Sequence, residues 1–235
     1  FKTAVIESEP DRELLLQKYR EGKFRALDPA PEIDEDTLRD TDHIVAMMGA
    51  EAYQEALVNG AQVILAGRST DAAIFAAIPV AQGFPPGLCW HAAQIMECGG
   101  AAVVSMEKPE GMICTITDDY FELEPVSPTQ SCSPLSVAAH ALYETGDPYM
   151  MREPGGVMDL THARYEASGE RTVRVSGSAF HPEPYTVKLE GAKKTGYRAM
   201  VLGGVRDPVI LSQFDSWFGG LQDSIRNNID AVYGE

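Results

Sequence analysis

Long apolar runs, positive charge and metal-binding motifs are all scarce in this sequence. No apolar run approaches the roughly 18 residues needed to cross a bilayer, which predicts no membrane span. Lys and Arg total 19 against 35 Asp and Glu, so the net charge is −16. Such an acidic surface repels phosphate backbones and anionic membranes, and we expect neither nucleic acid nor a membrane as a partner. An anionic substrate then needs a local basic pocket set against this field.

Cysteine is also sparse, with four residues: Cys89, Cys98, Cys114 and Cys132. Their spacing fits no zinc pattern, and the sequence contains no HxH, HxxxH or HExxH, so no metal site is predicted. It also has no GxxxxGK[ST], no helix-opening GxGxxG and no GxSxG, and we predict no cofactor. Without a secretory leader, we expect reduced thiols in a cytoplasmic protein. Phe1–Glu7 already resembles the interior of a strand, which predicts that the sequence is a piece of a longer chain.

The first half alternates short apolar strands with helices. Strands are predicted at 1–7, 43–48, 62–67 and 101–105, and helices at 11–22, 50–60, 71–78 and 87–98. Strand–helix–strand succession favours parallel strands joined by right-handed crossovers. We therefore predict an α/β fold with a parallel sheet and crossover helices over residues 1–110, as the end of a larger N-terminal domain.

The second half changes to short strands separated by glycine turns. Strands are predicted at 112–117, 164–168, 171–178, 185–191 and 197–204, and helices at 134–145 and 217–233. Ser133 followed by Pro134 is a strong helix start. We therefore predict a mixed or antiparallel, β-rich α+β part over residues 111–235.

The strongest candidate site is VILAGRSTDAAIF, residues 63–75, where a predicted strand passes into a predicted helix. In an open parallel sheet, ligands bind beyond the carboxyl ends of the strands. Arg68 would stand there beside the positive end of a helix, and its guanidinium suits a carboxylate or phosphate. Ser69 and Thr70 add hydroxyl contacts. The alternative is structural: Thr70 caps the helix, Asp71 is a first-turn acid, and Arg68 is a surface charge.

Three residues are candidates for moving a proton: Asp71, His91 and Glu97. His91 and Glu97 lie on a predicted helix in CWHAAQIMECGG. Six residues turn a helix by roughly 240°, so Glu97 points away from His91. The pattern favours the alternative that His91 is a core or interface histidine.

Further positive charges are candidates for substrate binding. Arg152, followed by Glu153, lies in DPYMMREPGGVMDL and could stand at a pocket rim. The alternative is a crossover loop whose glycines serve turns. Lys188 and Arg206 lie in the segment 185–208 and could receive an anionic substrate or stabilise enolate charge. The alternative for them is cross-strand salt bridging of little energetic value.

Five blocks occur in order along the chain: VILAGRSTDAAIF, CWHAAQIMECGG, DPYMMREPGGVMDL, RTVRVSGSAF and YTVKLEGAKKTGYRAMVLGGVRDP. Together they resemble the acyclic terpene utilisation AtuA family over roughly residues 42–215. Members of that family are longer, with a region before the part seen here. RSTD stands where a GR-x-x-D or GR-x-A-D string is common, and the Arg and Asp are kept. The resemblance implies breakdown of citronellol- and geraniol-type compounds through CoA thioesters, and it carries over no catalytic residue set.

We therefore predict a lyase or hydratase that acts on a branched acyl-CoA or a small carboxylic acid by proton transfer next to a carbonyl. In this hypothesis Arg68 anchors the anion, and Asp71, Glu97 or His91 moves the proton. Two alternatives stay open: a non-catalytic binding or scaffolding subunit that completes a site with a partner chain, and a metal-dependent hydrolase. As partners we expect an anionic small molecule such as a CoA thioester, and a second copy of the chain or a small partner subunit.

Overall fold

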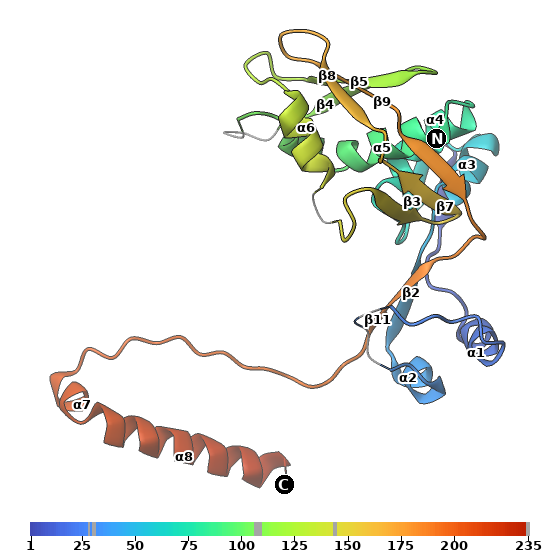
Figure 1. Ribbon diagram of the computed structural model, residues 1–235. Helices are drawn as coiled ribbons and strands as arrows, with labels where there is room; N and C mark the ends of the chain where they lie inside the picture. Colours follow the sequence, from blue (N-terminus) through green and yellow to red (C-terminus); the bar gives the residue numbers. More distant parts are fainter. Residues whose placement is uncertain (28, 30–31, 106–109, 143–144, 234–235) are drawn as a thin grey trace. The chain divides into compact units, whose positions relative to one another are not determined.

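The computed structural model of the chain describes residues 1–27, 29, 32–105, 110–142 and 145–233 (Figure 1). The chain divides into two compact units, Phe1–Lys194 and Thr195–Glu235. Within the first unit, buried residues from both sides of residue 110 belong to one hydrophobic cluster. The mixed α/β class is confirmed.

The described elements follow one another closely along the chain. The helices of the first unit are α1 (Arg12–Arg20), α2 (Glu35–Asp40), α3 (Glu51–Val58), α4 (Ala73–Ala81), α5 (Pro86–Met96), the 3-10 helix η1 (Gly99–Ala101) and α6 (Pro134–Ala141). The strands are β1 (Thr3–Ile6), β2 (His43–Met47), β3 (Val63–Ala66), β4 (Met112–Ile116), β5 (Tyr120–Pro125), β6 (Met150–Glu153), β7 (Gly156–Asp159), β8 (Arg164–Ala167), β9 (Val173–Ser176), β10 (Ala179–Pro182) and β11 (Lys188–Ala192). The second unit contains α7 (Pro208–Ser212) and α8 (Phe214–Tyr233).

Side-chain caps begin several of these helices. The Asp11 carboxylate accepts hydrogen bonds from the backbone N–H groups of Glu13 and Leu14 at the start of α1. Ser133 and Ser136 form a reciprocal capping box at the start of α6, with Pro at the first helical position. The helix start predicted at Ser133 is therefore confirmed. Each such cap contributes about 1 kcal/mol to helix stability.

The parallel sheet predicted for the first half is reduced to one pair of strands. β1 and β3 run parallel, from Thr3 opposite Val63 to Ile6 opposite Ala66. β2 pairs antiparallel with β11, with Lys188 opposite Met47. Apolar periodicity identifies a strand but does not specify its partner, and the partner of β2 comes from the distant end of the same unit.

Two further strand predictions are wrong. Residues 101–105 form no strand, because Gly99 begins a 3-10 turn in which the Ala102 N–H donates to the Gly99 carbonyl at 3.0 Å. Residues 197–204 form no strand either, and Tyr197, Val201 and Leu202 there are almost fully exposed. A strand needs a partner for its backbone groups, and this stretch has no ladder within the described part of the chain.

The second half is β-rich and antiparallel, as the sequence predicts. One sheet has the order β4-β5-β9-β8, and another has the order β10-β7-β6. Helix α5 packs against both, through β4 and β5 of the first sheet and β7 and β10 of the second. Its Leu88 and Ile95 share a cluster with Phe121 and Val173 of the four-stranded sheet. Trp90, on the same helix, belongs to a second cluster, so α5 is buried on nearly all sides. Burying a side chain such as Phe121 contributes about 1.5–3 kcal/mol.

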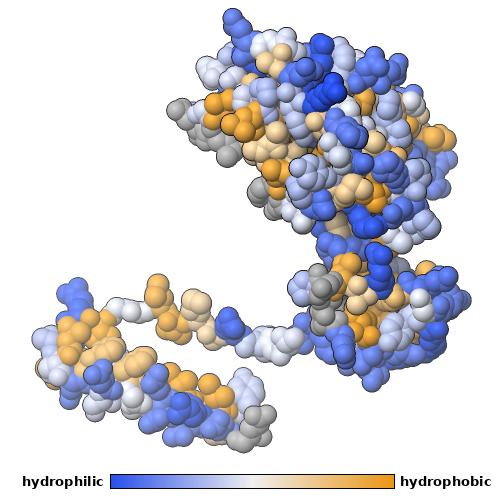
Figure 2. Space-filling model, viewed as in Figure 1, coloured by the Kyte–Doolittle hydropathy of each residue, from blue (hydrophilic) through white to orange (hydrophobic). Residues whose placement is uncertain are grey.

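The second unit presents an amphipathic helix. Apolar side chains recur along α8 at helical spacing: Phe214, Phe218, Leu221, Ile225, Ile229 and Val232. Their spacing follows the 3.6-residue period that places them on one face of a straight helix. Figure 2 shows apolar surface gathered along this helix, and the same side chains are exposed. Phe214 and Phe218 stack with ring centroids 5.5 Å apart.

Candidate functional site

The end of β3 is held tightly against neighbouring backbone. A Cβ atom added to Gly67 would lie 2.4 Å from the Ser8 Oγ and 2.8 Å from the Ser8 Cβ, so this position requires glycine. The Met48 N–H donates to the Arg68 carbonyl at 3.3 Å, and the Thr70 N–H donates to the Met48 carbonyl at 2.9 Å. The segment that the sequence singles out therefore emerges at the carboxyl end of β3 beside the end of β2.

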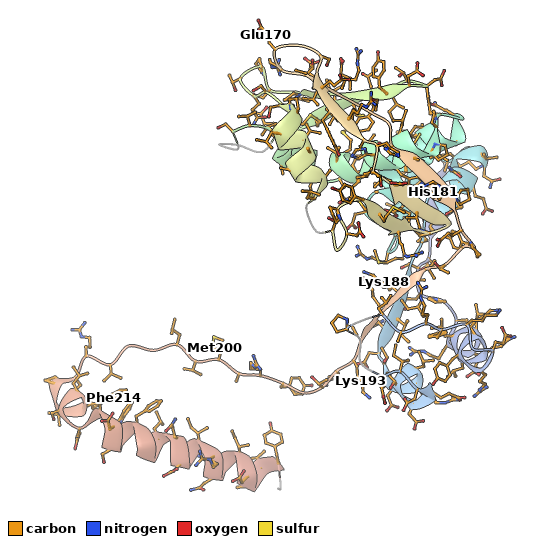
Figure 3. The ribbon with its side chains drawn as sticks, viewed as in Figure 1. Glu170, His181, Lys188, Lys193, Met200 and Phe214 are labelled. Carbon is orange, nitrogen blue, oxygen red and sulfur yellow. The ribbon has the colours of Figure 1, made fainter. Side chains whose placement is uncertain are left out.

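Arg68 is engaged by two carboxylates. Its Nε lies 3.1 Å from Glu190 Oε2, and its Nη1 lies 3.1 Å from Asp71 Oδ1. Lys188 approaches the other oxygen of Glu190, with Nζ 3.0 Å from Oε1. Figure 3 shows Lys188 on β11, the strand that carries Glu190. The hydrogen bond to Glu190 raises the pKa of Arg68, and the hydrogen bond from Lys188 lowers the pKa of Glu190.

This pairing alters the predicted role of the guanidinium. The Arg68 side chain is 37% exposed, but an incoming anion must replace Asp71 or Glu190 as its partner. Its charge is largely compensated by these two groups. Arg68 therefore has two roles at this position. It orients the Asp71 carboxylate, and it offers a positive charge to a ligand that displaces one of its partners.

A cavity of about 340 Å³ opens beside this segment. Its lining residues are Tyr53, Ser69, Asp71, Ile74, Phe75, Glu97 and Cys98. The Tyr53 hydroxyl and the Ser69 hydroxyl are 2.8 Å apart. The structure thus brings together three residues that the sequence predicts for the site, Ser69, Asp71 and Glu97, at one concave surface with two hydroxyl groups.

A larger cavity of about 870 Å³ adjoins β6, β7 and the end of α5. Its wall includes Gln94, Arg152 and Glu153. The Gln94 amide donates to Glu97 Oε1 at 3.3 Å, so one hydrogen bond joins the wall of the larger cavity to that of the smaller one.

Glu153 has an unusual environment in the structure, although the sequence does not single it out as a candidate site residue. Its Oε2 atom is buried and, within the described part of the chain, makes no hydrogen bond; the Thr70 hydroxyl oxygen is likewise buried without one. Burial raises the pKa of Glu153 to about 7, and the charges of Glu97 and Asp71 act in the same direction, while the nearby Thr70 opposes them. A substantial fraction of this carboxyl is therefore protonated at neutral pH.

The sequence predicts Arg152 and Glu153 as a charged pair in a loop at a pocket rim. Instead, residues 150–153 form β6, and Arg152 forms an ion pair with Glu183 at 2.5 Å. Alternation along this strand turns Arg152 outward and Glu153 to the more buried side. Recognising residues 150–153 as a strand would have predicted that the side chains of Arg152 and Glu153 face opposite sides.

His91 lies in the core. Its Nδ1 is 2.7 Å from the Ser178 hydroxyl and its Nε2 is 3.2 Å from the Tyr165 hydroxyl. The ring also makes an edge contact with Phe121, at a centroid distance of 5.2 Å. Burial lowers the pKa of His91 to about 3, so the imidazole stays neutral. The core alternative fits this environment, and His91 is not among the described residues that line either cavity.

The other predicted substrate-binding residues are separated. Arg152 stands on the wall of the larger cavity, and Lys188 belongs to the Arg68–Glu190 network. Arg206 belongs to the second unit.

The structure also bears on metal binding, on the reactivity of the thiols and on membrane-spanning helices. Among the described residues, no group of three or more His, Cys, Asp or Glu side chains is arranged to hold a metal ion. Burial raises the pKa of the Cys89 and Cys132 thiols to about 11, which makes them poor nucleophiles. In the part of the chain that the structure describes, no helix is both long enough and apolar enough to cross a membrane.

The cavity at the end of β3 is thus lined by the carboxyl groups of Asp71 and Glu97 and the hydroxyl groups of Tyr53 and Ser69, on a mixed α/β frame. The model of the family described as acyclic terpene utilisation family protein AtuA matches residues 2–105 and 125–230. The chain therefore belongs to the AtuA family, which its description assigns to the utilisation of acyclic terpenes. No curated protein and no solved structure matches the chain.

Proposed function

We propose that the protein is a lyase or hydratase that removes or adds water at a branched acyl-CoA or a small carboxylic acid. The supporting observation is the cavity at the end of β3, where Asp71 and Glu97 face a common space with Ser69. A carboxylate at such a position takes a proton from the carbon next to a carbonyl, a step that contributes about 10²–10⁴-fold to the rate. Membership of a terpene-utilisation family agrees with a branched acyl substrate.

Arg68 has a positioning role in this proposal. Its ion pair with Asp71 fixes the carboxylate at the edge of the cavity, and Glu190 fixes Arg68 in turn. Orientation of this kind matters because a small misplacement of a reacting group costs large factors in rate.

A dehydration assay tests the proposal. The probe is 3-hydroxy-3-methylbutanoyl-CoA, and the readout is the absorbance of the conjugated enoyl thioester that loss of water creates. We expect turnover by the wild-type chain and a loss of at least about tenfold in Asp71→Asn. Absence of turnover with this thioester and with the free hydroxy acid would contradict the proposal.

The same assay separates the two alternatives. A subunit that completes a site with another chain would give turnover only after that chain is added. A metal-dependent hydrolase would release free CoA instead of forming an enoyl thioester, and a chelator would abolish the release.

A further inference from the structure

Glu153 faces a different space from Asp71 and Glu97. It lines the cavity of about 870 Å³, whereas the other two carboxylates line the cavity of about 340 Å³. The Gln94–Glu97 hydrogen bond of 3.3 Å connects the two walls. The charges of Glu97 and Asp71 act on Glu153, so the three carboxyl groups lie near one another although they line different cavities.

The Glu153 carboxyl is unusually short of partners for its burial. Its Oε2 atom is shielded from solvent, and no described donor bonds to it. Arg152, the adjacent cation in the chain, turns to Glu183 instead. Among the described residues Glu153 forms no ion pair, and the nearby Thr70 hydroxyl opposes the effect of burial on its pKa without overcoming it. A neutral carboxyl with a proton to give therefore suits this position.

We propose that Glu153 is the catalytic acid of this site and donates its proton to a hydroxyl oxygen of a substrate held in the larger cavity. This inference rests on the proposed lyase or hydratase function and assigns a residue and a binding space that the sequence did not. Met150, Met151 and Val157 give the cavity apolar wall for a branched chain.

The step balances as a dehydration. The Glu153 O–H bond breaks, and its proton moves to the hydroxyl oxygen of the substrate. The carbon–oxygen bond breaks, and its electron pair leaves with the water that forms. Asp71 or Glu97, at the smaller cavity, takes the proton from the carbon next to the carbonyl, and the electrons of that C–H bond become the new C=C bond. Glu153 then regains a proton from solvent, and the carboxyl that took the proton from carbon returns a proton to solvent.

The experiment compares the wild type with Glu153→Gln, which keeps the shape of the side chain but has no acidic proton. The matched control is Glu124→Gln, an exposed carboxylate on β5. With 3-hydroxy-3-methylbutanoyl-CoA, we expect Glu153→Gln to lower kcat by at least about 100-fold. The thioester should still raise the melting temperature of the variant, and Glu124→Gln should keep wild-type turnover.

The pH dependence gives a second readout that needs no variant. A catalytic acid must be protonated, so wild-type kcat should fall as pH rises through about 7. Wild-type kcat that stays constant between about pH 6 and 8 overturns the assignment, even if Glu153→Gln fails to fold.

The outcomes separate this inference from the proposed function. Turnover by the wild type together with turnover by Glu153→Gln within about threefold of it overturns the role of Glu153 and leaves the function standing. Absence of turnover by the wild type overturns both.

Discussion

Arg68 and Glu190 form an ion pair, with the guanidinium Nε 3.1 Å from the carboxylate oxygen. The pair connects the segment after β3 to β11, which is the last strand of the first unit along the sequence. The same guanidinium reaches Asp71 at 3.1 Å. The Arg68 side chain thus connects Asp71, at the edge of the smaller cavity, to β11. Apolar periodicity in the sequence does not indicate that these two segments lie together.

Replacing Arg68 with Ala should lower turnover strongly and the free energy of unfolding only slightly. Both ion pairs are partly exposed, so we expect a loss of at most about 1 kcal/mol in the free energy of unfolding, measured by urea denaturation. Turnover should fall by at least about tenfold, because Asp71 loses the group that orients it. Arg20→Ala, which removes an exposed ion pair with Glu35, is the matched control. Wild-type turnover in Arg68→Ala would show that the orientation of Asp71 does not matter.

Gly67 should not tolerate a side chain. In Gly67→Ala the new methyl group would meet Ser8 at less than 3 Å, and we expect destabilisation of about 1–3 kcal/mol in denaturant unfolding. Gly146→Ala is the control, because a Cβ there meets no atom of the described residues within 4 Å. Ser8→Gly combined with Gly67→Ala should recover part of the loss, since the two sites contact each other. Equal stability of Gly67→Ala and Gly146→Ala would refute the close approach.

His91 should matter for stability rather than for turnover. His91→Leu leaves the Ser178 and Tyr165 hydroxyls without their partner, which costs about 1–3 kcal/mol at pH 7. The pKa of His91 is lowered to about 3 from 6.5, so its contribution is complete above about 6.5 and is lost as pH falls toward 3. Unfolding at pH 7 and at about pH 4 should therefore show a steeper acid loss in the wild type than in the variant. Identical slopes would contradict a buried neutral imidazole.

Glu153 should lower stability at alkaline pH. Its pKa is raised to about 7 from 4.5, so the folded state favours the protonated form. The resulting stabilisation is complete below about 4.5 and is lost as pH rises through about 7. Glu153→Gln carries no such charge, and we expect its unfolding free energy to exceed that of the wild type by on the order of 3 kcal/mol at pH 8. The two proteins should agree at about pH 4. A variant less stable than the wild type at pH 8 would exclude a buried unpaired carboxylate.

Local patterns predict local features of this chain. The Ser133 cap is confirmed. A parallel pair is present at the strand 62–67, but its partner is β1 and not the strand 43–48. Ser69, Asp71 and Glu97 do line a common cavity, because the carboxyl end of a strand and the adjoining helices determine their place. These features depend on a few neighbouring residues.

Contacts between residues that are distant in the sequence could not be predicted from local patterns. β2 pairs with β11 and not with the parallel strands, and Glu190 enters the site only through that pairing. Glu153 is half-buried, with its Oε2 atom shielded from solvent, because β6 pairs with β7 and the side chain lies at a cavity wall that also includes Gln94 of α5. Neither the pairing of distant strands nor the burial of one carboxyl has a signature in apolar periodicity.

Deuterium exchange tests most directly whether the carboxylates of this site move a proton next to a carbonyl. The measurement is incorporation of deuterium from D₂O into the carbon next to the thioester carbonyl of 3-hydroxy-3-methylbutanoyl-CoA, followed by mass spectrometry. The account predicts exchange by the wild type and its loss in Asp71→Asn combined with Glu97→Gln. Exchange at the uncatalysed rate by the wild type, or undiminished exchange by the double variant, would contradict it.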